Sequence, residues 1–297
     1  MQKIDQYMHE FLSELNYEPI ITMSLNLQGG KKLRSKLLLK IAGESEINYK
    51  ICAIIELIHA ASLLHDDVID EAKLRRGVKS INAQFGAKNA IMLGDILYSK
   101  AFYELSLIDL KLAKSISNAV VKLSIGELMD VNLSNNFNTN ENAYMDMIYN
   151  KTAVLIEASA KCGAILANLN EDDFALYGKN LGLAFQIVDD LLDIKADEQT
   201  LGKPVMNDFK EGKTTLAYIY LYEKLNTQEQ EKLKSYYKKQ LNDDEIVWIK
   251  TKMQECKIFD KINDKLKFYS KNALDTIKKY NIKDLEDIIK NMIEREF

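Results

Sequence analysis

Residues 49–70 read YKICAIIELIHAASLLHDDVID, and this segment decides what kind of fold the chain can form. It contains no glycine or proline and carries apolar residues on most helical turns, which predicts a largely buried helix. The helix ends in acid, because Asp66, Asp67 and Asp70 lie within its last five positions. On a helix, positions i and i+4 share one face and i+1 lies nearby, so the three carboxylates crowd one patch. Carboxylates crowded beside an apolar segment call for a compensating cation.

The rest of the chain also favours helices. Only two prolines occur among 297 residues, which permits long helices. Apolar residues recur at helical spacing in 90–133, 177–194 and, with many lysines and glutamates, about 222–297. Glycine, proline and asparagine mark loops at 27–31, 71–79, 134–141 and 197–213. No alternating strand pattern, linker or repeat divides the chain, so we expect an all-α fold with one domain over residues 1–297.

The composition excludes some classes of function. The formal net charge is −4 and the isoelectric point about 5.6, so no nucleic-acid partner is expected. Three cysteines lie far apart without metal-binding spacing, which favours buried thiols in a reducing compartment. The N-terminus has no apolar signal core, and no apolar run approaches the roughly 20 residues that span a bilayer. We therefore expect a cytoplasmic protein.

A second acidic cluster repeats the spacing of the first. The sequence DDLLD places Asp189, Asp190 and Asp193 at the end of another apolar helix. Carboxylates at a helix C-terminus oppose the helix macrodipole. Oxygen ligands without histidine or cysteine suit Mg²⁺, which prefers one or two carboxylates plus substrate phosphates. A single such motif is often a solvated helix end, but two copies favour facing Mg²⁺ sites that hold a diphosphate.

Basic residues accompany both clusters. Arg75 and Arg76 follow the first cluster, and Lys203 and Lys213 follow the second. A fifth basic residue, Lys151, begins the segment KTAVLIEA. The sequence GGKKLR adds further cations behind two glycines, which allow a backbone to approach an anion, although a glycine turn before a basic helix is common. Arginine matches phosphate oxygens with paired hydrogen bonds, and lysine acts as a point charge. The pattern predicts diphosphate binding, with apolar helices around the attached organic tail.

Taken together, the motifs resemble a known family. They are GGKKLR, LIHAASLLHDDVIDEAKLRRG, FGAKNAIMLGDILYSKAF, GELMD, KTAVLIEAS, LGLAFQIVDDLLDI and GKPVMNDFKEGKTTLAYI, in this order between roughly residues 25 and 220. As a set they are similar to trans-isoprenyl diphosphate synthases, and most closely to long-chain polyprenyl synthases of the octaprenyl type. The resemblance implies an isoprenoid synthase helical bundle around a central apolar cavity, usually as a homodimer.

The reaction that the resemblance implies is head-to-tail condensation of an allylic diphosphate with isopentenyl diphosphate. The product would be a long trans-polyprenyl diphosphate, which can pass to membrane enzymes of quinone synthesis. No side chain is assigned as the base, because the freed diphosphate can take the proton.

The resemblance also implies a role for each matching residue. Three Mg²⁺ ions would be held by Asp66, Asp67, Asp70, Asp189, Asp190 and Asp193. The allylic diphosphate would be held by Arg75, Lys151, Lys203 and Lys213. Isopentenyl diphosphate would be held by Gly30, Lys31, Arg34, His59 and Arg76. Beside the reacting carbons, oxygen dipoles that favour a developing allylic cation would come from Thr152 and Gln186.

Four positions depart from the usual pattern of the family. Lys32, Ser35, Asp130 and Ala217 stand where arginine, proline, glutamine and proline are common. None of them is an expected metal ligand. Asp130 changes the charge near the expected diphosphate site, with an effect that the sequence does not reveal.

Product length is expected to depend on the helix that carries Asp66. Ala61 and Ser62 are small and leave the passage below the metal site open, whereas aromatic residues at these places mark short-chain members of the family. Tyr98 or Phe102 could form its floor, although both could equally be core residues. The sequence does not distinguish products that differ by one isoprene unit. Two candidate blocking side chains on successive turns of a helix lie only about 5.4 Å apart along its axis.

Three other functions stay open from the sequence. The chain could make a shorter geranylgeranyl or farnesyl product. It could be a non-catalytic partner subunit of a heteromeric synthase. The two intact aspartate clusters disfavour this role, because a purely structural subunit does not need them. A terpene cyclase shares the first aspartate pattern, but its second metal motif usually mixes Asn or Asp, Ser or Thr, and Glu, unlike DDLLD.

Overall fold

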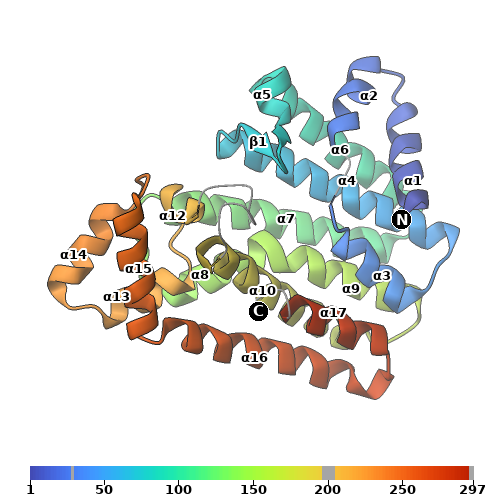
Figure 1. The fold of residues 1–297 in the computed structure, drawn as a ribbon. Helices are drawn as coiled ribbons and strands as arrows, with labels where there is room; N and C mark the ends of the chain where they lie inside the picture. The colour runs from blue at the N-terminus through green and yellow to red at the C-terminus, as the bar shows by residue number, and fades with distance from the viewer. Residues whose placement is uncertain (28–29, 196–204, 294–297) are drawn as a thin grey trace. The chain divides into compact units, whose positions relative to one another are not determined.

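The computed structural model describes residues 1–27, 30–195 and 205–293. These residues form helices joined by loops, with a two-stranded β-hairpin among them (Figure 1). The predicted all-α fold is therefore confirmed. The chain divides into two compact units, which we call unit 1 (Met1–Val121 with Leu155–Gly178) and unit 2 (Lys122–Val154 with Lys179–Phe297). The single domain and the central apolar cavity stay predictions.

Unit 1 contains most of the N-terminal helices. Its elements are α1 (Gln2–Ser13), α2 (Glu18–Ser24), η1 (Leu25–Leu27), α3 (Leu33–Ala42), α4 (Glu46–Ile69), β1 (Leu74–Arg75), β2 (Val78–Lys79), α5 (Ile81–Phe85) and α6 (Ala87–Ser106). It also contains the start of α7 (Leu110–Leu133), most of α9 (Val154–Leu166) and the start of α10 (Glu171–Lys195).

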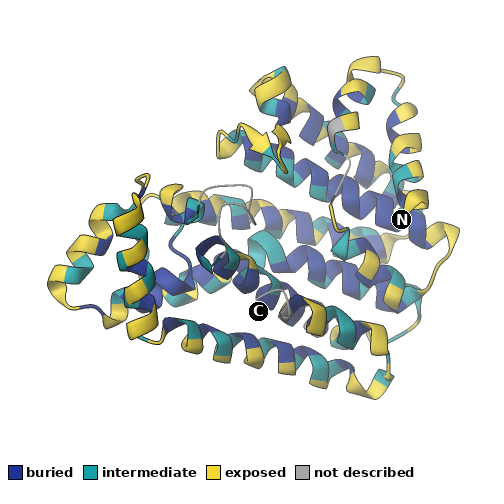
Figure 2. Ribbon diagram, viewed as in Figure 1, coloured by how far each residue is buried: buried dark blue, intermediate teal, exposed yellow. Residues whose placement is uncertain are grey.

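Unit 2 takes up the remainder of α7 and α10 and the C-terminal helices. Its other elements are α8 (Glu141–Ile148), the π-helical turn η2 (Tyr149–Ala153), α12 (Asn207–Lys210), α13 (Leu216–Lys224), α14 (Thr227–Tyr236), α15 (Asp243–Glu255), α16 (Ile258–Ile277), η3 (Lys278–Tyr280) and α17 (Lys283–Ile293). Figure 2 shows that α14, α15 and α16 each keep an exposed face, as predicted for amphipathic helices.

Helix α4 forms the core of unit 1 and is buried along most of its length (Figure 2). Ser45 caps its N-terminus by accepting a hydrogen bond from the Asn48 amide at 3.2 Å. The helix ends at Ile69, so the first aspartate cluster lies at its C-terminal end, as predicted. Among the described helices, α4 is long and apolar enough to cross a membrane, but 67% of its apolar window is buried inside the protein. It is therefore a core helix.

Close contact between α4 and α6 depends on Gly94. A Cβ atom at this position would lie 2.4 Å from His65 Nε2 on α4. The same nitrogen lies 3.2 Å from the Ile91 carbonyl oxygen and 3.4 Å from the Asp95 carboxylate, both on α6. Because His65 directly precedes Asp66, this contact fixes the end of α4 that carries the first aspartate cluster.

The predicted loop 71–79 contains the β-hairpin. Its strands β1 and β2 pair antiparallel, with Arg75 opposite Val78. At the turn, Arg76 and Gly77 have φ angles of 54° and 80°, as a two-residue type I′ turn requires. The two arginines therefore differ in backbone role, since Arg75 belongs to the ladder and Arg76 to the turn.

Two glycines bring neighbouring helices against η2 in unit 2. A Cβ atom on Gly126 of α7 would lie 2.2 Å from the Lys151 backbone nitrogen. A Cβ atom on Gly182 of α10 would lie 2.5 Å from Ala153 Cα. Short π-helical stretches occur often at functional sites. This one carries Lys151 and Thr152, and the glycines hold its backbone between α7 and α10.

The remaining predicted loops and the cysteines agree with the structure in part. The loop predicted at 134–141 leads into α8, whose N-cap Asn140 accepts a hydrogen bond from the Ala143 amide at 3.1 Å. Of the other predicted loops, residues 28–29 and 197–204 lie outside the described residues, whereas α12 forms within 205–213. Of the three free thiols, Cys52 and Cys162 are buried as predicted, and Cys256 is half-buried.

The close approach of α7 to η2 predicts that Gly126→Ala destabilises the protein. Backbone atoms of η2 cannot rotate away from a methyl group as a side chain could, so we expect a loss of about 1–3 kcal/mol in the free energy of unfolding. Urea denaturation followed by circular dichroism measures this loss. Asn132→Ala, at an exposed position of the same helix, is the control. A Gly126→Ala variant as stable as the control would contradict the contact.

Candidate active site

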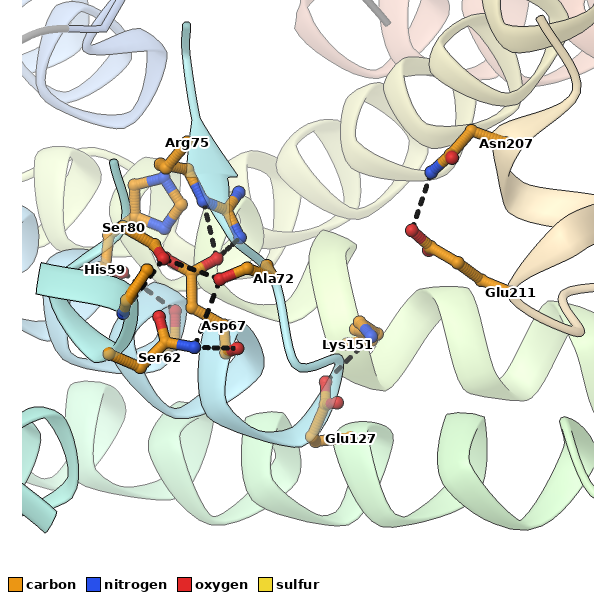
Figure 3. Close-up of polar contacts among 12 residues, drawn as sticks. His59, Ser62, Asp67, Ala72, Arg75, Ser80, Glu127, Lys151, Asn207 and Glu211 are labelled. Atoms are coloured by element: carbon orange, nitrogen blue, oxygen red, sulfur yellow. Dashed lines mark hydrogen bonds and ion pairs between the residues drawn. The ribbon is translucent and has the colours of Figure 1, made fainter. Parts of the chain in front are cut away.

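The first aspartate cluster is tied to the hairpin by an ion pair. Buried Asp67 accepts a hydrogen bond from Arg75 Nε at 2.8 Å and a second one from Nη2 (Figure 3). Burial alone would lower the pKa of Arg75, but the hydrogen bond and the attraction of Asp67 outweigh it and raise that pKa. Asp66 and Asp70 attract the same guanidinium. The structure thus brings the predicted metal ligands and a predicted diphosphate ligand together in unit 1.

Two side chains that follow the hairpin hold the start of the segment that leads to Arg75, and Figure 3 shows the bond from Ser80 to Ala72. Asn82 Nδ2 donates to the carbonyl oxygens of Asp67 at 3.0 Å and Ala72 at 3.1 Å. Ser80 Oγ donates to the same Ala72 oxygen at 2.5 Å. These bonds join the end of α4 to the start of α5, so the hairpin between them is held where Arg75 reaches Asp67.

Predicted isopentenyl diphosphate ligands also come together in unit 1. The Gly30 backbone, with φ of 113°, lies so close to Arg76 that a Cβ atom would be 2.8 Å from its Nη2. His59 is half-buried on α4. Burial, together with the positive charges of Arg34, Arg76 and Arg75, lowers the pKa of His59 well below its usual value. A neutral histidine among three arginines leaves a positive environment suited to an anion.

A buried carboxylate accompanies this basic group. Burial lowers the pKa of Arg34, and the negative charge of Glu56 opposes that effect. Glu56 accepts a hydrogen bond from Ser35 Oγ at 2.5 Å, so the serine that departs from the family pattern fixes its carboxylate. Lys31 is exposed, and Lys32 forms an ion pair with Asp5 of α1.

The second aspartate cluster lies on α10 in unit 2, and neutral side chains donate to its Asp190. Asp190 accepts hydrogen bonds from the Tyr144 hydroxyl and, at 2.8 Å, from Gln186 Nε2. Thr152 Oγ1 donates to Gln186 Oε1 at 2.7 Å. The two residues expected beside the reacting carbons are thus brought together, and a chain of hydrogen bonds links them to Asp190. Tyr144 was not expected from the sequence.

Asp208 adds a further carboxylate to the second cluster. Its backbone amide donates to Asp193 Oδ2 at 3.1 Å. Burial, followed by the negative charges of Asp208 and Asp189, raises the pKa of Asp190 well above its usual value, and the bonds from Tyr144 and Gln186 only partly oppose this. A buried carboxylate in such surroundings is stabilised either by a proton or by a cation.

The predicted lysine ligands of unit 2 have acidic neighbours. Lys151 Nζ lies 2.8 Å from Glu127 Oε2 (Figure 3). It also lies 2.5 Å from Asp130 Oδ2, and both carboxylates belong to α7. Lys213 lies 2.9 Å from Glu211 Oε2, and Asn207 Nδ2 donates to Glu211 Oε1 at 2.6 Å. Lys203 lies outside the described residues.

The donor set fits Mg²⁺, although the side chains do not form a ready-made cage. Within residues 1–27, 30–195 and 205–293, no three His, Cys, Asp or Glu side chains are arranged to hold a metal ion. In unit 1, Arg75 donates hydrogen bonds to the Asp67 carboxylate. In unit 2, Tyr144 and Gln186 donate to the Asp190 carboxylate. Mg²⁺ usually takes one or two carboxylates and completes its shell with water and substrate phosphates, so a complete protein cage is not required.

Comparison with known proteins identifies the family. The family model described as polyprenyl synthetase matches residues 19–253. The chain belongs to the polyprenyl synthetase family. An octaprenyl pyrophosphate synthase structure from Helicobacter pylori superposes with a TM-score of 0.94 and 44% identity, covering 98% of this chain and 97% of that one. The predicted isoprenoid synthase fold and trans-prenyltransferase function are thereby confirmed.

Other members of the polyprenyl synthetase family differ in product. A geranylgeranyl diphosphate synthase from Sulfolobus acidocaldarius is 33% identical over 314 residues, covering 95% of this chain and 94% of the relative. A polyprenyl synthase from Caulobacter crescentus, solved with calcium and isoprenyl diphosphate, has a TM-score of 0.89 and 27% identity, covering 99% of this chain and 94% of that one. Similarity of the whole chain therefore does not fix the product length of this polyprenyl synthetase.

Several residues of the site had a weak signal in the sequence. Asp208 lies in GKPVMNDFKEGK, where the sequence predicts lysine ligands but no role for the aspartate. Glu127 lies in GELMD, one residue after a glycine that only the structure places against η2. Tyr144 and Glu56 lie on apolar helical faces, where a single polar residue reads as an ordinary core position.

The lowered pKa of His59 predicts a pH-dependent contribution to stability. Because the folded pKa lies below the unfolded value near 6.5, the unfolded chain binds more protons below that pH. The free energy of unfolding should then fall as the pH drops from 6.5, by about 1 kcal/mol at pH 5.5 relative to His59→Gln. Denaturation series at both pH values measure this difference. His9→Gln, at an exposed position of α1, is the control, and equal pH dependence of all three proteins would contradict the prediction.

Proposed function

We propose that this prenyltransferase is Mg²⁺-dependent and condenses an allylic diphosphate with isopentenyl diphosphate through the two aspartate clusters. The observation that carries this proposal is the burial of two cluster carboxylates beside charged groups. Asp67 is buried against Arg75, and Asp190 is buried beside Asp208 and Asp189, which raises its pKa. Carboxylates that are buried in this way are stabilised by positive charge, which cations brought in with a diphosphate would add.

The metal ligands in this proposal are the six aspartates of the two clusters, Asp66, Asp67, Asp70, Asp189, Asp190 and Asp193, with three ions per site. When bound, Mg²⁺ would neutralise the charge that builds on the departing diphosphate. The allylic diphosphate would be held by Arg75, Lys151, Lys213 and Lys203. The calcium and isoprenyl diphosphate found with the Caulobacter crescentus synthase support a divalent cation and a diphosphate as ligands of this fold.

Isopentenyl diphosphate is assigned to the basic group of unit 1. Gly30 and Arg76 are in direct contact, and Arg34 lies in the same electrostatic environment as His59. Neutral His59 can donate one hydrogen bond to a phosphate oxygen while the arginines supply the charge. Lys31 follows Gly30 in the chain and completes the set.

Thr152 and Gln186 are assigned to the reacting carbons. The Thr152 hydroxyl donates to Gln186, and the Gln186 amide nitrogen donates to Asp190, so each oxygen has a fixed orientation. Fixed oxygen dipoles favour positive charge on an allylic carbon at no cost of reorganisation. The proton lost after carbon–carbon bond formation goes to the freed diphosphate, and no side chain of this chain is assigned as the base.

We assign a long, octaprenyl-type product. On α4, Ala61 is fully buried and Ser62 is half-buried with its hydroxyl donating to the His59 carbonyl at 2.9 Å. Neither side chain is large enough to block a passage. Tyr98 and Phe102 of α6 stack with ring centroids 6.3 Å apart, and Tyr98 lies 5.7 Å from the His65 ring. This aromatic row is the proposed floor.

Product length is tested with Ser62→Phe. An aromatic ring on α4 one turn before Asp66 should block elongation, so the principal product should become shorter by several isoprene units. Chromatography of the dephosphorylated products measures this. Ser106→Phe is the control, because Ser106 also donates to the carbonyl three residues earlier but is exposed. An unchanged product distribution for Ser62→Phe would remove α4 from the assignment.

The active form is proposed to be a homodimer. Val121, Ile125 and Leu128 follow one face of α7 at helical spacing and are 59%, 47% and 60% exposed. An apolar stripe of this kind suits contact with a second copy of the chain. We further assign the protein to the cytoplasm, with its lipid product passing to membrane enzymes of quinone synthesis.

The metal assignment predicts that replacing both Asp66 and Asp67 with alanine lowers kcat by about 100-fold or more at saturating Mg²⁺, as expected for loss of a charge-stabilising group. Incorporation of labelled isopentenyl diphosphate measures the rate. The paired variant Asp243→Ala/Asp244→Ala, at the exposed start of α15, is the control. Turnover within a few-fold of the control would refute the assignment.

Two alternatives are tested with the same purified protein. Product formed from the allylic diphosphate alone would indicate a cyclase. Absence of turnover by the purified chain, with recovery on adding a partner subunit, would indicate a heteromeric synthase.

A further inference from the structure

Three residues of the motif GELMD surround Lys151. The Gly126 backbone lies against the Lys151 backbone, where a Cβ atom would be 2.2 Å from its nitrogen. From the following turn of α7, Glu127 Oε2 lies 2.8 Å and Asp130 Oδ2 lies 2.5 Å from the Lys151 ammonium (Figure 3 shows the contact with Glu127). One short segment of α7 therefore fixes both ends of the lysine.

The two carboxylates exceed the charge of the lysine. Together the three side chains carry a net charge of −1, and they are only 21% (Lys151), 13% (Glu127) and 7% (Asp130) exposed. Water screens such partly buried charges weakly. Burial raises the pKa of the Tyr144 hydroxyl, and the negative charges of Asp190 and Asp130 raise it further, so Asp130 lies in an acidic part of unit 2. A diphosphate that approaches Lys151 therefore meets an ammonium group that is already paired with two carboxylates.

We propose that Asp130 competes with the substrate diphosphate for Lys151 and thereby weakens the hold of this lysine on the allylic diphosphate. This inference rests on the proposed role of Lys151 in diphosphate binding. When diphosphate binds, the Lys151 ammonium must share its donors between phosphate oxygens and Asp130 Oδ2. When diphosphate leaves, the ion pair with Asp130 is restored, which favours release.

Asp130 is the main competitor, and Glu127 has a weaker part. Asp130 Oδ2 accepts a hydrogen bond from Lys151 Nζ, and its carboxylate is the more buried of the two. Among the residues that the structure describes, neither buried oxygen of Glu127 accepts a hydrogen bond, although Oε2 forms the ion pair. Charge-assisted hydrogen bonds are the stronger contacts. Removal of the charge on Asp130 should therefore free Lys151 more than removal of the charge on Glu127.

The test is calorimetric titration of inorganic diphosphate, with Mg²⁺ present, into the wild type and Asp130→Asn. Asparagine keeps the shape and an acceptor oxygen but removes the charge. We expect about tenfold tighter binding, which corresponds to about 1.4 kcal/mol. Glu127→Gln should tighten binding less, and it supplies the same test where Asp130→Asn fails to fold. Asp146→Asn, the same substitution at an exposed position of α8, should bind as the wild type does.

A double-mutant cycle with Lys151→Met shows whether the effect passes through this lysine. In the Lys151→Met background, Asp130→Asn should no longer tighten diphosphate binding. Equal tightening in both backgrounds would overturn the proposal, because the effect would then be a general change of field. Equal affinity of the wild type and Asp130→Asn would overturn it as well. A wild type that binds no diphosphate at all would instead contradict the proposed function.

Discussion

Charge compensation for buried carboxylates is the constraint on which the rest of this molecule depends. Asp67, Asp190 and Asp193 are at most 7% exposed, although each stands near the C-terminal end of a helix, where the macrodipole already disfavours negative charge. The two units meet this constraint differently. Unit 1 places Arg75 against Asp67, whereas Asp190 in unit 2 receives its hydrogen bonds from the neutral side chains Tyr144 and Gln186. These two donors of Asp190 bring no formal positive charge, whereas Arg75 does.

Local backbone geometry determines where the side chains near the two aspartate clusters lie. The type I′ turn at Arg76 and Gly77 folds the hairpin so that Arg75 reaches Asp67. Gly126 and Gly182 allow α7 and α10 to contact η2, and η2 carries Lys151 and Thr152. The positions of Lys151 and Thr152 thus depend on glycines that have no chemistry of their own, and the rigidity of these backbone contacts fixes the orientation of both side chains.

Much of the fold and the acidic site could be predicted from the sequence, because both follow from local spacing. The buried helix 49–70 and the triplets at its end and at 189–193 need only the helical period. Asp208, Tyr144 and Glu56 could not be predicted in this way, because their relation to the site arises from tertiary contacts such as the Asp208 amide bond to Asp193. The departures Ser35 and Asp130 were visible, but their consequences were not. Only the structure shows that Ser35 holds Glu56 and that Asp130 holds Lys151.

In the function proposed for this protein, both aspartate clusters bind divalent cations together with diphosphate. Electron paramagnetic resonance with Mn²⁺ in place of Mg²⁺ counts bound ions directly, with and without inorganic diphosphate. We expect that diphosphate increases the number of ions bound to the wild type, and that Asp190→Asn and Asp67→Asn each reduce that number. Diphosphate-dependent Mn²⁺ binding that is unchanged in both variants, or absent from the wild type, would contradict it.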